Sequence, residues 1–266
     1  MTSRQAIPEW DPRAPDVLAD QVAAYDGLRR RCPVAHSDYL HASLFRHADA
    51  LRVLGDAETF SNVVSTHLSV PNGMDPPRHA TYRRLIDPYF SAQALAAFEP
   101  ACRRIARDRV ARLPAQGEVE WMDAFARDCA LQLLCAFMGW PAALHAPLRE
   151  WVRKNHAATL AQDRAALADI AFEFDGHIRV QIALRKASGL SGDDVTTRLL
   201  KERIDGEPLP DAEIVSIVRN WTVGEVSTMA ASFGILAQAL ASHPALQQSL
   251  RADAAGLPAA IDEILR

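Results

Sequence analysis

His79 and Arg83 form the first pair of side chains whose spacing suggests binding chemistry. They are four residues apart, so on a helix that begins near Pro77 both side chains project from one face. Two cationic donors on one face suit a carboxylate or a phosphate group, which they would hold by charge-assisted hydrogen bonds. The pair predicts an anion-binding site, and a solvated helix face is the alternative that spacing alone leaves open.

A second polar group lies in the longest apolar stretch of the chain, at Glu225, Ser227 and Thr228. A threonine hydroxyl inside a helix can donate to the carbonyl one turn back and bend the helix. Glu225 is the nearest carboxylate and lies one turn before Thr228 on a similar face. The group is either a functional polar site or a polar seam in a buried helix.

Glu263 and Arg266 close the sequence and are three residues apart, which allows an ion pair on one helix face. The last segment has apolar residues at Ile261, Ile264 and Leu265 and no capping residue after them. A helix that stops in this way leaves carbonyl groups and an apolar face without partners. We expect that more polypeptide belongs here, or that the chain associates with itself through this face.

Composition narrows the classes of protein that these residues could serve. The chain has 266 residues, a formal charge of −4, 49% hydrophobic and 23% charged residues, which is ordinary for a globular protein with a large core. This charge excludes a strongly basic nucleic-acid-binding protein. No run of 18 apolar residues occurs, and the first residues lack a basic region followed by an apolar one. We therefore expect a cytoplasmic protein without a membrane segment.

The cysteines show no metal-binding spacing. The four are Cys32, Cys102, Cys129 and Cys135. None forms a closely spaced doublet, and the one close pair is six residues apart in an apolar helical stretch. Core or free thiols are therefore expected rather than disulfides or a metal site.

The elements that would position these residues are mainly helical. Residues 34–47 predict a small hairpin, a short helix follows from Asp49, and the Pro-rich stretch 61–77 predicts a long loop that could form the wall of a pocket. Periodicity then predicts helices at 78–90, 91–113, 121–138, 142–158, 161–187, 193–203, 211–242, 244–253 and 257–266. The segment 211–242, with Asp211 as its N-cap, is apolar on most faces and should lie at the centre of the domain.

The most specific stretch runs from Asp75 to Leu85, reads DPPRHATYRRL, and is followed by DPYFS at 87–91. It closely resembles the DPPxHxxxRR signature of soluble bacterial cytochrome P450 monooxygenases. Four further stretches agree in order: CPVAHSDY at 32–39, DAETFSN at 56–62, SHP at 242–244 and EILR at 263–266. The resemblance implies one cytochrome P450-like domain over residues 1–266, mainly α with a small β-sheet and truncated at the K helix.

The resemblance also implies roles for the polar residues. His79 and Arg83 match the residues that hold the haem propionates, and Thr228 matches the threonine that helps to deliver protons to iron-bound dioxygen. The family usually has an acidic residue just before this threonine, where this chain has Ser227, and Glu225 stands where glycine is more common. Glu263 and Arg266 match a buried ion network whose downstream arginine is not in this sequence.

The axial cysteine that the family supplies from a Gly-rich loop beyond this ion pair is also not in the sequence. No metal ligand can be named among the four cysteines, so the 266 residues alone should not catalyse. The resemblance implies haem as the cofactor, a small organic substrate, and electrons from ferredoxin- or reductase-type partners. Substrate contacts are expected in the loop 61–73, which includes Val70, in the turn 158–162, and at Val223 and Gly224. The helices at 142–158 and 161–187 are expected to act as a lid.

Two other functions remain open from the sequence. A truncated, non-catalytic homologue could act as a binding or scaffold protein that completes its fold with a partner chain. Haem could also be held without a thiolate by a histidine, for which His67 in the loop is the candidate.

Overall fold

The computed structural model describes residues 9–31, 33–65 and 67–266, and these residues form two compact units. Residues up to 64, together with 74–76, make up the first unit, and residues 65–73 and 77–266 make up the second. The expectation of one domain over residues 1–266 stays a prediction.

The first unit consists of short helices around a hairpin. Its elements are α1 (Pro15–Ala19), α2 (Gln21–Arg31), β1 (Val34–Ser37), β2 (His41–Leu44) and α3 (His47–Leu54). The predicted hairpin is confirmed, because β1 and β2 pair antiparallel from Val34 with Leu44 to Ser37 with His41. Trp10, Tyr25 and Phe45 pack edge to face or tilted, with ring centroids 5.1 to 6.0 Å apart.

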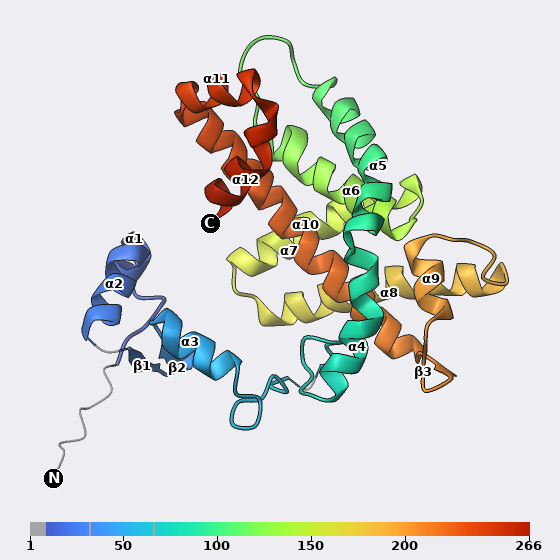
Figure 1. Ribbon diagram of the computed structural model, residues 1–266, viewed down its shortest axis with the longest axis horizontal. Helices are drawn as coiled ribbons and strands as arrows, with labels where there is room; N and C mark the ends of the chain where they lie inside the picture. The colour runs from blue at the N-terminus through green and yellow to red at the C-terminus, as the bar shows by residue number, and fades with distance from the viewer. Residues whose placement is uncertain (1–8, 32, 66) are drawn as a thin grey trace. The chain divides into compact units, whose positions relative to one another are not determined.

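The second unit is almost entirely helical, as predicted. Its elements are α4 (Arg78–Ile86), η1 (Asp87–Phe90), α5 (Ala92–Val110), η2 (Met122–Ala126), α6 (Arg127–Met138), η3 (Ala142–Leu144), α7 (His145–Leu160), α8 (Arg164–Ala187), α9 (Val195–Lys201), β3 (Arg203–Ile204), β4 (Glu207–Pro208), α10 (Asp211–Ser242), α11 (Pro244–Ala252), η4 (Ala254–Gly256) and α12 (Leu257–Leu265). Figure 1 shows α10 running through this unit, with α6 and α8 beside it.

One detail of α10 differs from the prediction. The helix bounds agree, but Asp211 is not the N-cap: Pro210 precedes the first turn, and no side chain caps it. Asp211 lies inside the first turn and accepts a 2.6 Å bond from the Lys186 ammonium of α8. The negative charge of the carboxylate therefore stabilises the N-terminus of α10, and its bond to Lys186 joins α10 to α8.

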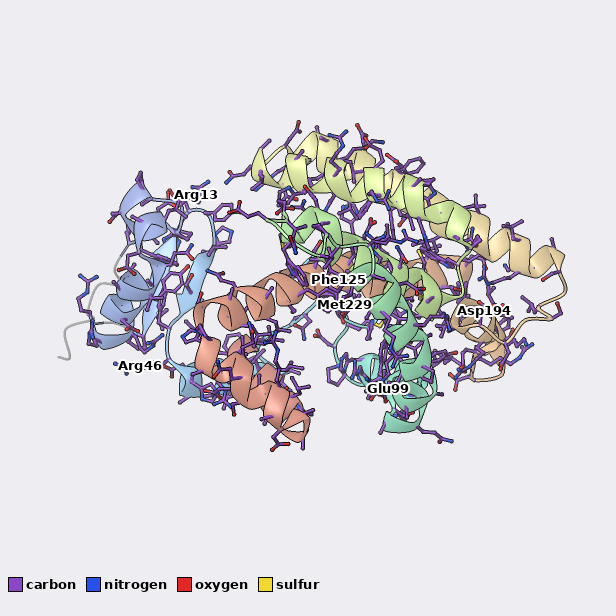
Figure 2. The ribbon with its side chains drawn as sticks, turned by 90° about the horizontal axis from the view of Figure 1, so that it is seen from above. Arg13, Arg46, Glu99, Phe125, Asp194 and Met229 are labelled. Atoms are coloured by element: carbon purple, nitrogen blue, oxygen red, sulfur yellow. The ribbon has the colours of Figure 1, made fainter. Side chains whose placement is uncertain are left out.

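The first half of α10 forms the centre of the helical unit. Ile214, Val215, Ile217 and Val218 are buried, and the helix contacts α6, α8, α9 and η2. Figure 2 shows Phe125 of η2 and Met229 of α10 close together where these two elements meet. By length and composition α10 is the one helix of the described residues that could span a membrane.

Candidate functional site

The DPPRHATYRR stretch leads into α4, and two of its side chains, Arg78 and Tyr82, contact α10. Arg78 Nη2 lies 2.8 Å from Glu213 Oε1, and the Tyr82 hydroxyl donates to Glu213 Oε2 at 2.5 Å. Glu213 and Tyr82 are both buried. Burial and the neighbouring Glu213 carboxylate raise the pKa of the Tyr82 hydroxyl, so it stays protonated and donates. This cluster joins the signature segment to the central helix.

The Glu213 cluster leads to a stability prediction. We expect Glu213→Ala to lower the free energy of unfolding by about 2 kcal/mol, because the buried Tyr82 hydroxyl loses its acceptor. Urea unfolding followed by circular dichroism measures this loss. Glu207→Ala is the control, since Glu207 is exposed in the same unit and should change stability by less than about 0.5 kcal/mol. Equal losses in the two variants would contradict a stabilising role for Glu213.

The predicted anion-binding pair follows on the same helix. Arg83 is half-exposed and makes an ion pair with Asp87 at 2.6 Å, one turn further along the chain. His79 is half-buried, and no hydrogen bond joins its ring to another described residue. The two residues share a helix face, as their spacing predicts, and their role as ligands of the haem propionates stays a prediction.

Thr228 lies in a continuous stretch of α10. Its hydroxyl donates to the Gly224 carbonyl at 2.9 Å and is 3.3 Å from the Glu225 carbonyl, so the predicted bond to the preceding turn is present. Thr228, Ser227 and Glu225 are exposed. They are therefore accessible on the helix surface, and their catalytic role stays a prediction.

The loop that was predicted to form a pocket wall is hydrogen-bonded to three side chains of α10, Ser216, Arg219 and Asn220. Ser216 accepts from the Val70 amide at 2.9 Å and donates to the Leu68 carbonyl at 2.8 Å. Asn220 donates to the Val70 carbonyl at 2.8 Å, and Arg219 donates to the Leu68 carbonyl at 2.8 Å. Val70 is fully buried. The segment 68–70 is thus held tightly, a feature that sequence spacing did not reveal.

Three of the expected substrate contacts differ in how deeply they are buried: they are Val70, Val223 and Gly224. Val70 is buried, Val223 is half-buried and Gly224 is exposed. None of the three lines the cavity that lies between η2, α6, α7 and α10. Their contact with a substrate stays a prediction.

The helical unit contains a cavity with a volume of about 660 Å³. Side chains from η2, α6, α7 and α10 line it. Two of the lining residues were predicted as site residues: Ser227, and Thr159 in the turn 158–162. Its size is in the range of sites for small organic ligands.

The terminal pair is present but solvent-exposed. Arg266 Nη1 lies 3.3 Å from Glu263 Oε2, and the two side chains are 78% and 70% exposed. An isolated exposed pair of this kind contributes little to stability. In the described residues it forms an ion pair within one helix rather than a buried network.

The described cysteines do not fit an axial thiolate. Cys129 and Cys135 are buried in α6, and burial raises the pKa of their thiols to about 11 and about 12. Burial also raises the pKa of the Cys102 thiol. Cys129 and Cys135 are only 1% and 0% exposed, and Cys102 lies inside helix α5, so none of the three stands in an open loop where a haem iron could reach its sulfur. Cys32 lies outside the described residues, and His67 is an exposed residue of the loop.

Comparison with known proteins identifies the relatives of this chain. No family model matches it. It is 26% identical to erythromycin C-12 hydroxylase of Saccharopolyspora erythraea, covering 94% of this chain and 66% of that protein. It is 25% identical to cyclomarin C epoxidase CymV of Salinispora arenicola, covering 84% of this chain and 60% of that protein. The solved structure of cytochrome P450 TbtJ1 matches with a TM-score of 0.79 and 26% identity, over 94% of this chain and 67% of that one.

These matches agree with the signature on α4 and with the long central helix α10. Relatives and solved structures alike are bacterial cytochrome P450s, and the chain spans about two thirds of their length. This chain is therefore a relative of the bacterial cytochrome P450s and has the cytochrome P450 fold over the part that it spans.

Proposed function

We propose that this chain forms part of a haem-dependent monooxygenase that inserts one oxygen atom from O₂ into a small organic substrate. The observation that carries the proposal is the match of about nine tenths of the chain to proteins named as a hydroxylase and a P450. Thr228, Ser227 and Glu225 are the proposed catalytic residues. His79 and Arg83 are the proposed ligands of the haem propionates.

We do not expect the 266 residues alone to catalyse the reaction. The three described cysteines lie inside helices α5 and α6, and two of them are fully buried, so the axial ligand would have to come from elsewhere. The proposed enzyme works in the cytoplasm and receives electrons from ferredoxin- or reductase-type partners. Its substrate would be a small organic molecule, as for the relative named as an erythromycin hydroxylase.

A second function is favoured by the surface of α12. Leu257, Ile261 and Leu265 are spaced four residues apart on this short helix, and each is about 40% exposed, so they form one apolar row at the surface. A non-catalytic binding or scaffold protein that pairs with another chain through this surface would explain their exposure.

One experiment separates the two functions. The purified 266-residue chain is mixed with haemin, reduced and treated with carbon monoxide, and its absorption spectrum and mass in solution are recorded. We expect no thiolate-type Soret shift from the chain alone, because its described cysteines lie inside helices and two of them are buried. A thiolate-type shift would contradict the statement that the axial ligand comes from outside these residues. A monodisperse monomer would contradict the scaffold function, whereas stable self-association without haem would support it.

A further inference from the structure

The cavity of about 660 Å³ in the helical unit combines an apolar floor with a charged rim. Its floor contains Leu131 of α6 and Val226 and Ala230 of α10, all of which are buried. Met122 of η2 and Val152 of α7 add apolar surface from two further elements. A ligand here would gain hydrophobic contact over most of its body.

The rim carries three acidic and three basic side chains, which are Asp123, Asp128, Glu150, Arg127, Arg149 and Arg153. Two of the basic residues are neutralised within their own helical segment. Arg127 pairs with Asp123, one turn before it, and Arg153 pairs with Glu150 at 2.6 Å. Asp128 and Arg149 are the two charged rim residues outside these pairs.

Asp128 is shared by two arginines. Arg149 binds it through Nε at 2.6 Å and Nη2 at 2.9 Å, and Arg109 of α5 binds it through Nη2 at 3.0 Å. Asp128 and Arg109 have side chains that are only 13% and 9% exposed. One carboxylate therefore faces two guanidinium groups, and this wall of the cavity has one excess positive charge.

The buried arginine of this group also has an unsatisfied donor. Arg109 Nε is buried and has no hydrogen-bond partner among the described residues. Its Nη2 donates to the Ala124 carbonyl at 3.1 Å, so this buried guanidinium is only partly satisfied. Arg149 is 56% exposed and lines the cavity, so it is the arginine that a ligand can reach.

We propose that this cavity binds an amphipathic organic acid, with its apolar body on the α6 and α10 floor and its carboxylate at Arg149. The carboxylate supplies the negative charge that Asp128 alone does not provide for two arginines. Asn155 and His156 of α7 also line the cavity and can hydrogen-bond to polar groups on the ligand body. The proposal does not depend on haem binding.

The test uses 2-naphthylacetate and its neutral amide, which have the same apolar ring and nearly the same shape. We expect isothermal titration calorimetry on the 266-residue chain to show one site that binds the acid about 10-fold more tightly than the amide. Arg149→Gln should remove this preference. The variant should fold, because Asp128 keeps its ion pair with buried Arg109. Equal affinity for acid and amide in the wild type would overturn the proposal.

Two further variants locate the binding site. Arg153→Gln is the matched control, because Arg153 lines the same cavity but is already paired with Glu150; the preference for the acid should remain. Ala231→Trp places a large ring at an exposed position of the lining and should abolish binding of both probes. Unchanged binding in Ala231→Trp, or loss of the preference in Arg153→Gln alone, would overturn the assignment to Arg149 and this cavity.

Discussion

Replacing Gly139 by alanine is expected to destabilise the helical unit by about 4 kcal/mol or more, among the largest effects of a single methyl group. Gly139 ends α6 with φ at +69°, and an added Cβ would lie 2.3 Å from Asp194 Cβ and 2.7 Å from its Cγ. Non-bonded carbon atoms do not approach so closely, so the backbone at one of the two residues must shift. Urea unfolding followed by circular dichroism measures the loss.

Asp194 has little freedom to move away from an alanine at 139. Its side chain caps α9 by accepting from the Thr197 amide at 3.1 Å, and it accepts from Arg185 Nε at 2.8 Å. Burial acts to raise the pKa of its carboxyl, but the bonds from Thr197 and Arg185 outweigh burial and hold the pKa below its ordinary value. Figure 2 marks Asp194, the N-cap of α9, and the next helix residue but one, Thr196, donates to the Met138 carbonyl at the end of α6 at 2.7 Å.

Two other glycines separate the steric cause from the backbone cause. Gly189 has nearly the same φ, +68°, but no atom lies within 4 Å of an added Cβ, so Gly189→Ala should cost only about 1 kcal/mol. Gly176 lies inside α8 with open space around it, and Gly176→Ala should stabilise the helix by up to about 1 kcal/mol. A loss in Gly139→Ala no larger than that in Gly189→Ala would show that contact with Asp194 is unimportant.

The helices could be predicted from the sequence because local signals bound them. Proline or glycine stands near many helix ends, and the bounds of α10 agree at both ends with the predicted segment 211–242. The hairpin at β1 and β2 followed from alternating residues around a polar centre. The π-helical turn η2 was predicted as ordinary helix, because a single wide turn leaves no local sequence pattern.

The elements that escaped prediction are short or polar. Helix α2 has a mainly polar sequence that ends in three arginines, so no apolar stripe marks it. Strands β3 and β4 are two residues each and pair across the turn at Asp205 and Gly206, both of which have positive φ. Pairs this short depend on the turn and not on a periodic pattern.

The candidate site was only partly predictable, because spacing reveals neighbours on one helix and not contacts between distant segments. The Thr228 bond to the preceding turn is local and was predicted. The pairing of Arg78 with Glu213 joins residues 135 positions apart, and Asp128 draws arginines from two other helices. The cavity beside α10 depends on how η2, α6 and α7 pack, which no short pattern encodes.

The loop at 61–77 is also held by contacts between distant segments that its sequence does not reveal. These contacts lead to the second prediction of a large loss of stability. The Pro and Gly content of the loop predicted an irregular segment, yet residues 68–70 are bonded to buried Ser216 and to Asn220 of α10. These contacts satisfy the amide and carbonyl of buried Val70 and the carbonyl of Leu68, which make no helix or sheet bond. The anchoring by α10 thus replaces secondary structure as the source of order in this part of the loop.

We expect the double variant Ser216→Ala/Asn220→Ala to release this segment and to lose about 2–5 kcal/mol of stability. Ser216→Ala alone removes the partner of the buried Val70 amide, which costs about 1–3 kcal/mol, so this amide should exchange with solvent about 10- to 100-fold faster. Asn220→Ala removes the donor to the Val70 carbonyl and adds to the effect. Hydrogen exchange of residues 67–73 measures the local release, and urea unfolding measures the global loss.

Ser232→Ala is the matched control, because Ser232 is a half-buried serine of the same helix that makes no hydrogen bond to the described part of the loop. It should leave exchange at residues 67–73 unchanged. Faster exchange confined to this segment in the double variant would show that α10 holds the loop locally. Exchange that accelerates equally in all helices would instead mean that the variant unfolds as a whole. An unchanged rate at Val70 would contradict the anchoring and leave the order of the loop to its own turns.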